Sequence, residues 1–431
     1  MLDIKYLLAN VEAVKQNCRN RNVPTDILDA VDVVVALEQK RKTLLQEVEE
    51  VRRLQNANAQ ATGKEKDPEK RQAFIAEGKQ LKASIGDNET ELKSLDAQLK
   101  SELARIPNLT HPDAPVGALE DESLELRKVG TPRVFDFPAR DHVEIGKALD
   151  LIDFESGAKV SGHGFYFLKN DAVLLELALQ QFAIRTLVAK GFSPIVTPDL
   201  ARNQILEGIG FTPRGTETQI YSVEDSDLSL IGTAEITLGG MHADEIFDEA
   251  VLPLKYVGLS HCFRTEAGAA GRASKGLYRV HQFTKIEMFA FTTPEASDQA
   301  HAELLAIEEE IFTALGIPYR VLDICSGDLG GPAYRKYDLE AWMPGRGEAG
   351  EYGEVTSTSD CTDYQARRLN IRYRPSGQKG TRFVHTLNGT ALALSRALIV
   401  ILENYQRADG LVDVPQVLQP YLGKEIIGRR P

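Results

Sequence analysis

Hydrophobic positions recur at intervals of four and three along two long stretches near the start of the chain. The clearer stretch has this spacing at Phe74, Gly78, Leu81, Ile85, Asn88, Leu92, Leu95 and Leu99. A related spacing runs through Leu37, Leu44, Val48 and Val51, and the polar segment TGKEKDP at 62–68 separates the two. These seams predict two helices packed antiparallel, with Asn88 fixing their register. We expect a coiled-coil arm at about residues 28–104, preceded by an amphipathic helix from Asp3 to about Arg19.

A period of two marks the stretch from Leu259 to Phe291 as two strands around a Gly/Ala-rich basic loop at 267–276. On the second strand, one face carries Arg279, Phe283, Lys285 and Glu287, and the other face carries Val280, Ile286 and Met288. Arg264 and Glu266 share a parity on the first strand, so a hairpin can place them beside the first of these faces. An aromatic ring among fixed cations and carboxylates suits a nucleotide, although a solvated sheet face with cross-strand ion pairs fits the same pattern.

Other stretches place further elements around this hairpin. Helical spacing predicts three more helices, at 141–151, 171–190 and 296–315. A strand at 193–197 ends before Pro198, and the segment from Thr386 reads as a strand that continues as a helix to about Gln406. Three prolines and a glycine at 106–117 indicate a domain boundary. We therefore expect an N-terminal domain at 1–110 and an α+β domain at 118–431.

Composition favours a folded cytoplasmic protein. The 431 residues are 42% hydrophobic, which is enough for a sizeable core. The four cysteines lie far apart and form no C-x-x-C pair, which predicts reduced thiols. The N-terminus lacks an apolar core of signal-peptide length, and uninterrupted apolar runs are too short to span a bilayer. We expect no contact with a membrane.

The net charge of −13 argues against nucleic acid as a partner for most of the surface, and DNA is not expected. The arm differs, because residues 40–82 contain 11 Lys/Arg against 7 Asp/Glu. A local basic patch can bind RNA while the rest of the molecule is acidic.

Three segments resemble the signature motifs of class II aminoacyl-tRNA synthetases. Phe263-Arg264-x-Glu266, the loop, and Gly276 to Phe283 with Glu287 resemble the second motif in the form found in the seryl-tRNA synthetase family. The helix at 171–190 with its strand resembles the first motif, and 386–396 resembles the third. The resemblance implies a coiled-coil arm followed by a catalytic domain with an antiparallel β-sheet flanked by helices, and a homodimer built through the first motif.

The resemblance also implies site residues. Those for serine are Thr233, Ala234, Glu235, Arg264, Glu287, Asn388 and Thr390. Those for ATP are Arg264, Thr265, Glu266, Val280, Phe283, Glu354, Val355, Thr356, Ser357 and Arg396. Glu354 and Ser357 would also hold Mg²⁺ with ATP, and no zinc is expected. Thr356 and Thr390 stand where the family usually has serine.

Within this family, the implied activity is serine–tRNA ligation through seryl-adenylate, with tRNA(Ser), and tRNA(Sec) as well, as the acceptor. The arm would bind tRNA, and its candidate phosphate contacts are Lys40, Arg41, Lys42, Arg52, Arg53, Lys64, Lys66, Lys70 and Arg71. The alternatives are a paralogue that loads a small amino acid onto a carrier protein, and a non-catalytic RNA-binding or coiled-coil scaffold. The arm argues against the first alternative, and the full set of ATP-site residues argues against the second.

Overall fold

The structure is a computed structural model and describes residues 1–211, 219–266 and 275–429. The chain divides into two compact units, Met1–Leu109 and Thr110–Pro431. Each unit has its own hydrophobic core, because the clusters of buried side chains do not mix residues of the two.

The first unit consists of helices α1 (Ile4–Ala9), α2 (Val11–Asn20), α3 (Thr25–Lys64) and α4 (Pro68–Arg105). The single helix predicted from Asp3 to Arg19 is therefore wrong in one respect. Asn10 leaves the helical region, with φ −135° and ψ 39°, and its side-chain amide donates to the carbonyl of Tyr6. Asparagine competes with the helix in this way because its side chain can hydrogen-bond to nearby backbone.

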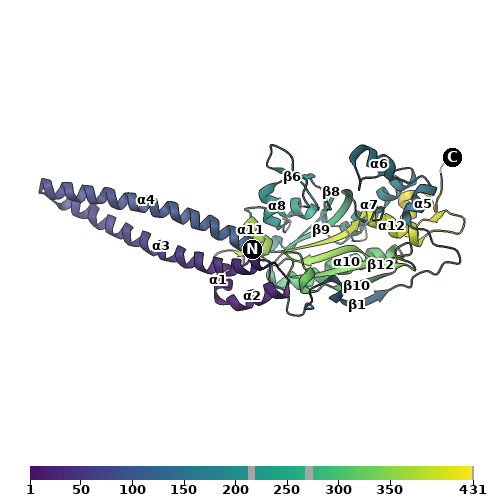
Figure 1. Ribbon diagram of the computed structural model, residues 1–431, viewed down its shortest axis with the longest axis horizontal. Coiled ribbons are helices and arrows are strands. Elements are labelled where there is room, and N and C mark those ends of the chain that lie inside the picture. The colour runs from purple at the N-terminus through teal and green to yellow at the C-terminus, as the bar shows by residue number, and fades with distance from the viewer. Residues whose placement is uncertain (212–218, 267–274, 430–431) are drawn as a thin grey trace. The chain divides into compact units, whose positions relative to one another are not determined.

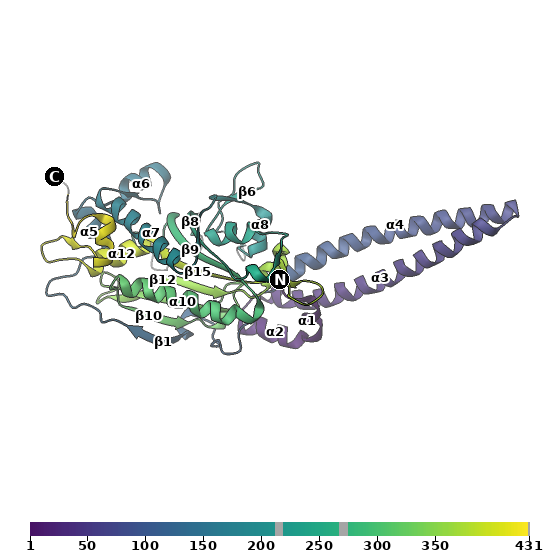
Figure 2. The same cartoon turned by 180° about the vertical axis from the view of Figure 1, so that it is seen from behind.

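Helices α3 and α4 pack side by side as an antiparallel coiled coil, which confirms the predicted arm (Figures 1 and 2). Near the base of the arm the seam residues Leu44, Val48, Leu95 and Leu99 are buried. Toward the turn the seam becomes polar, and the Asn58 amide donates to the Glu77 carboxylate of the opposite helix at 2.7 Å. The turn itself is only three residues, and Asp67 caps the first backbone N–H groups of α4.

The second unit is built on an eight-stranded sheet with the order β1-β10-β11-β12-β15-β9-β8-β4. Its strands are β1 (Leu124–Val129), β4 (Ser193–Val196), β8 (Leu254–Phe263), β9 (Gln282–Thr292), β10 (Tyr319–Asp323), β11 (Arg335–Met343), β12 (Glu351–Asp360) and β15 (His385–Ala393). Neighbouring strands are antiparallel, except that β4 runs parallel to β8. This confirms the predicted α+β class with an antiparallel sheet.

Helices cover the two faces of this sheet unequally. The larger core packs α5 (His142–Ala148), α7 (Asp171–Ala189), α10 (Ser297–Ala314) and α12 (Leu394–Asn404) against one face. A smaller core places α8 (Asn203–Ile209), α9 (Ala234–Gly240) and α11 (Tyr364–Leu369) against the other face, around Phe289 and Phe291. The second face is thus covered at the end of β9 that carries these phenylalanines.

Short elements complete the described chain. They are the helices α6 (Phe154–Ser161) and α13 (Gln419–Leu422), the strands β2 (Ile152–Asp153), β3 (Phe167–Leu168), β5 (Leu200–Arg202), β6 (Leu228–Leu230), β7 (Ile246–Asp248), β13 (Arg372–Arg374), β14 (Arg382–Phe383), β16 (Val412–Asp413) and β17 (Ile426–Ile427), and five 3₁₀ turns. By length and composition α7 is, within the described residues, the one helix that could cross a membrane. Its buried residues, such as Leu175 and Leu179, instead pack in the larger core.

The hairpin predicted from Leu259 to Phe291 is present as β8 and β9, although β8 begins earlier, at Leu254, and β9 starts only at Gln282. The backbone N–H of Arg264 donates to the carbonyl of His281, so pairing continues just beyond the strands. Residues 267–274 of the predicted loop lie outside the described residues.

Candidate active site

The open part of the second sheet face forms a cavity of about 600 Å³. Strand register explains why its polar residues gather there. Cys262, Ser260 and Gly258 of β8 lie opposite Phe283, Lys285 and Glu287 of β9, and Glu287 lies opposite Thr390 of β15. Residues paired in this way share a face of the sheet, and alternate residues along a strand return to it. For the residues of β9 the cavity face is the one predicted from parity. The prediction is wrong for Val280, which precedes the strand and lines a smaller neighbouring cavity instead of sharing the core face of Ile286 and Met288.

A β-bulge in β12 aligns two further candidates. Glu340 pairs with Glu354 and Leu339 pairs with Thr356, so Val355 is an extra residue. Residues three apart in a regular strand face opposite sides, but the bulge lets Glu354 and Ser357 both reach the cavity. A second bulge follows Thr390 in β15.

Glu235 lies at one end of the cavity, just inside the start of α9. Thr233 caps this helix, since its hydroxyl accepts the backbone N–H of Glu235 at 3.3 Å. The Glu235 oxygen Oε1 accepts side-chain N–H groups from Gln365 at 2.7 Å and Asn388 at 3.0 Å. Burial, and next the nearby Glu287 carboxylate, raise the pKa of Glu235 to about 7. One carboxylate oxygen is thus held by two donors from the protein.

Glu287 belongs to a buried triad with Lys285 and Thr390. Its Oε2 lies 2.5 Å from the Lys285 ammonium and accepts the Thr390 hydroxyl at 3.1 Å. Glu287 is 2% exposed, Lys285 6% and Thr390 8%, so the ion pair is shielded from solvent. Buried charges of this kind are held in place by their partners because an unpaired charge there is costly.

Arg264 lines both this cavity and a smaller neighbouring one. Its guanidinium lies 5.5 Å from the centre of the Phe283 ring, and its Nε donates to the carbonyl of Gly232 at 3.3 Å. Beyond it, Glu266 pairs with Arg279 at 3.3 Å. The geometry thus places Arg264 and Phe283 on the same side of the sheet.

Arg396 also lines the smaller cavity. Its Nη1 lies 3.2 Å from the Glu354 carboxylate and donates to the Glu354 carbonyl at 3.0 Å. Burial disfavours the ionised form of Glu354, but Arg396, Lys336 and Arg264 together hold its pKa below the usual value. An anionic Glu354 faces both cavities as a result.

Most of the residues implied by sequence resemblance line these two cavities. The larger one is lined by Thr233, Glu235, Arg264, Glu287, Glu354, Ser357, Asn388 and Thr390. The smaller one is lined by Arg264, Glu266, Val280, Phe283, Glu354, Val355, Thr356, Ser357, Thr390 and Arg396. Two of the predicted site residues, Ala234 and Thr265, are not among the described residues that line either cavity. Ala234 is fully buried in the smaller core, and Thr265 donates its backbone N–H to Gln219.

The oxygen donors of β12 fit a magnesium ion. Glu354 and Ser357 offer a carboxylate and a hydroxyl on the same wall, which are hard ligands. Opposite Ser357, Asp338 has a buried Oδ1 without a hydrogen-bond partner in the described part of the chain. Burial raises the pKa of Asp338 to about 7. In the same described part, no three His, Cys, Asp or Glu side chains converge as a metal-binding group.

Two neighbours of the site carried no role in the sequence analysis. Gln365 holds Glu235 and accepts the Thr386 hydroxyl at 2.7 Å, but a neutral amide in a short helix gives no sequence signal. Lys285 was predicted on the correct face of β9. Its alternation with Phe283 and Glu287 could have identified it as a cavity residue.

Comparisons with known proteins agree with this geometry. The model of the seryl-tRNA synthetase N-terminal domain matches residues 1–110, and that of the class II tRNA synthetase core domain (G, H, P, S and T) matches residues 220–405. A serine–tRNA ligase of Rubrobacter xylanophilus is 58% identical over 428 residues, covering 99% of each chain. The chain belongs to the seryl-tRNA synthetase family.

Other members of the family are similar over their whole length. A serine–tRNA ligase of Treponema denticola is 56% identical and covers 99% of this chain and 100% of its own. The crystal structure of seryl-tRNA synthetase from Pyrococcus horikoshii complexed with ATP superposes with a TM-score of 0.94 at 42% identity, covering 100% of both chains.

The raised pKa of Glu235 predicts a pH-dependent cost to stability. The folded protein keeps a proton on Glu235 that the unfolded chain releases, so stability falls as pH rises from the ordinary pKa toward about 7. Relative to Glu235→Gln, the wild type should lose up to about 3 kcal/mol between about pH 5 and about pH 8. Thermal denaturation of both proteins across this range measures the difference. Glu49→Gln, at an exposed position of α3, is the control, and parallel curves for wild type and Glu235→Gln would contradict the prediction.

Proposed function

We propose that this protein activates serine with ATP and transfers the seryl group to tRNA(Ser), and also to tRNA(Sec). The observation that supports this most directly is that Arg264 lines both cavities. One guanidinium there borders both the candidate amino-acid residues and the candidate nucleotide residues. Adenylation needs such an arrangement, because the carboxylate of one substrate must reach the α-phosphorus of the other.

Serine would bind in the larger cavity. Its ammonium group would donate to Glu235 and Thr233, and Arg264 would pair with its carboxylate. Its hydroxyl would meet Glu287, with Asn388 and Thr390 closing the pocket. Because a site that pairs a substrate hydroxyl leaves polar groups unpaired with alanine or glycine, it discriminates strongly against them.

ATP would lie in the smaller cavity. Phe283 would stack on adenine, Glu266 would accept from its amino group, and the backbone near Val280 would follow the nucleotide. Arg396 would contact the γ-phosphate. Glu354 and Ser357 would hold Mg²⁺, which supplies positive charge to the phosphates when bound.

Catalysis would rest on positioning and on charge neutralisation rather than on a protein nucleophile. The serine carboxylate attacks the α-phosphorus and pyrophosphate leaves. Arg264 would contact both the carboxylate and the α-phosphate during this step. A ribose hydroxyl at the 3′ end of tRNA then takes the seryl group from the adenylate. The family match over 1–110 and the presence of the arm leave no support for the carrier-protein or scaffold alternatives. We place the protein in the cytoplasm, which suits four buried cysteines that form no disulfide among the described residues.

The amino-acid assignment predicts selective exchange of pyrophosphate. Serine should support ATP–pyrophosphate exchange, whereas alanine and glycine should do so on the order of 10⁴-fold less efficiently in kcat/KM, because neither offers Glu287 the hydroxyl donor that serine supplies. Threonine should also be disfavoured, because its extra methyl group would have to fit beside the Lys285, Glu287 and Thr390 side chains. The measurement is steady-state exchange with each amino acid, and an absence of serine-dependent exchange would reject the proposed function.

We propose that the arm binds tRNA mainly near its turn. Five of the nine basic candidates form ion pairs within the arm: Lys40, Arg41, Lys42, Arg52 and Arg53. The remaining four, Lys64, Lys66, Lys70 and Arg71, have no ion pair among the residues that the structure describes. Cations without an acidic partner are better placed to neutralise phosphate.

Reversing these four charges to glutamate should therefore lower kcat/KM for tRNA charging by at least about tenfold and weaken its salt dependence. Pyrophosphate exchange should be unchanged because the serine and ATP residues lie in the other unit. Glu69→Lys, also near the turn, is the matched control and should not reduce charging. Equal losses of exchange and charging in the four-charge variant would contradict this division of roles.

We propose that α7 and β4 form a homodimer interface. Val173, Leu177 and Val188 of α7 are exposed although the helix is apolar, and Val196 of β4 is 80% exposed. β4 is also the edge strand of the sheet. An exposed apolar helix beside an open sheet edge is typical of a surface that a partner covers.

Leu177→Asp should place a charge in this interface and shift the protein from dimer to monomer. Sedimentation velocity at several concentrations distinguishes the two. Ile75→Asp, at an exposed apolar position of α4, should leave the dimer intact. A wild-type protein that sediments as a monomer would rule the interface out.

A further inference from the structure

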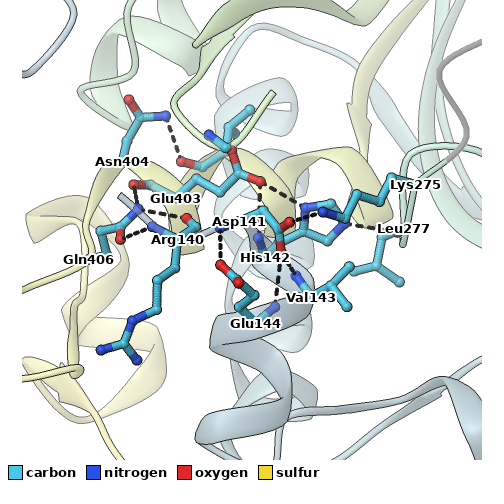
Figure 3. Close-up of polar contacts among 12 residues, drawn as sticks. Arg140, Asp141, His142, Val143, Glu144, Lys275, Leu277, Glu403, Asn404 and Gln406 are labelled. Carbon is cyan, nitrogen blue, oxygen red and sulfur yellow. Dashed lines mark hydrogen bonds and ion pairs between the residues drawn. The ribbon is translucent and has the colours of Figure 1, made fainter. Parts of the chain in front are cut away.

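A buried polar cluster includes residues of three segments that are distant in the sequence (Figure 3). His142 begins α5, Glu403 lies near the end of α12, and Leu277 lies in the segment that leads into β9. His142 is 4% exposed and Glu403 is 2% exposed. A charged group at this depth requires partners, because burying it unpaired is costly.

The carboxylate of Glu403 has three donors. Its Oε1 accepts the backbone N–H of His142 at 3.0 Å and the His142 Nδ1 group at 2.8 Å. Its Oε2 accepts the backbone N–H of Gly345 at 2.8 Å. Both carboxylate oxygens are therefore engaged, and the imidazole ring is fixed from one side.

The other side of the ring holds the backbone of Leu277. The Leu277 N–H donates to His142 Nε2 at 3.1 Å. Since an amide N–H only donates and a carboxylate only accepts, the ring must accept at Nε2 and donate at Nδ1. Glu403 thus sets the tautomer that can bind Leu277, which is the usual way a carboxylate orients an imidazole.

The backbone near Leu277 is pressed closely onto this ring. Gly276 has φ +62°, and a Cβ at that position would lie 2.1 Å from His142 Nε2. Only glycine fits both the backbone angle and the short distance. Lys275 adds an ion pair with Asp141, the residue before His142.

The residues that follow Leu277 form one wall of the ATP cavity. Tyr278, Arg279 and Val280 line it. The carbonyl of Tyr278 accepts from Arg396 Nε at 3.4 Å, and the Arg396 guanidinium lies 4.7 Å from the centre of the Tyr278 ring. Displacing Leu277 would move the groups that orient Arg396, the proposed γ-phosphate contact.

We infer that His142 is a positioning residue for ATP. Its Nε2 accepts the backbone N–H of Leu277 and so holds Tyr278–Val280 in place, while Glu403 fixes the tautomer of the His142 ring. This inference rests on the proposed ATP site. It predicts no effect of His142 on the amino-acid cavity, because among the described residues Tyr278, Arg279 and Val280 line the smaller cavity and not the larger one.

Two amide variants separate the two sides of the ring. His142→Asn keeps a donor near the Nδ1 position for Glu403 but leaves the Leu277 N–H without an acceptor. His142→Gln places an amide oxygen near the Nε2 position and loses the Nδ1 donor. Each variant loses one buried hydrogen bond, so the two serve as matched controls for stability.

Pyrophosphate exchange and thermal denaturation of the full-length protein test the inference. His142→Asn should raise KM for ATP about tenfold with KM for serine unchanged, whereas His142→Gln should stay within about twofold of the wild type. Gly276→Ala gives an independent route, because its methyl group should displace the chain from the ring and also raise KM for ATP.

Three results would overturn the inference. They are an unchanged KM for ATP in both His142→Asn and Gly276→Ala, equal rises in the Asn and Gln variants, or a parallel rise in KM for serine, which would indicate a general structural role. Failure of the proposed function is a separate outcome, since it would appear as a lack of serine-dependent exchange in the wild type.

Discussion

The pairing register of β9 with its neighbours is the constraint on which the site depends. Ile286, Met288 and Ala290 point into the larger core, while the intervening residues point to the opposite face. On that face Phe289 and Phe291 are covered by helices, and Phe283, Lys285 and Glu287 remain open to the cavities. A slip of one residue would exchange the two sets. The hydrophobic core therefore specifies the orientation of the polar residues without contacting a substrate.

The carboxylates of the site differ in how many cationic side chains lie near them. Glu354 remains an anion because three cations surround it, and Glu287 is paired with Lys285. Among the residues that the structure describes, none forms an ion pair with Glu235, so burial dominates and raises its pKa to about 7. A buried carboxylate that lacks a cationic partner is stabilised more by a bound ammonium group than a solvated carboxylate would be. The ammonium group of serine is therefore proposed to bind at Glu235, a cavity carboxylate whose burial is not offset by an ion pair in the described part of the chain.

Local sequence patterns predicted what depends on periodicity. The heptad spacing located the arm, and the parity of Arg264 and Phe283 placed both on one side of the sheet. Asn10 interrupts the first helix because its side chain competes for the backbone, which apolar spacing does not reveal. The bulge at Val355 could not be read from the sequence, since two strands must be aligned before an extra residue is recognised. The His142–Glu403 contact joins residues 261 positions apart, and Gln365 reaches Glu235 across 130. Contacts of this range arise only from the assembled fold.

The bulge also explains why threonine is tolerated at position 356, where the family usually has serine. Thr356 pairs with Leu339, a residue of the larger core, so its side chain faces the core and is 1% exposed. Its hydroxyl donates to the buried Glu308 at 2.8 Å. Burial raises the pKa of Glu308 well above its usual value, so this carboxyl can remain neutral beneath the sheet. A threonine keeps the hydrogen bond that a serine would make and adds a methyl group to the core. The substitution leaves Glu354 and Ser357 free to face the cavity, because the bulge, rather than the residue at 356, sets their direction.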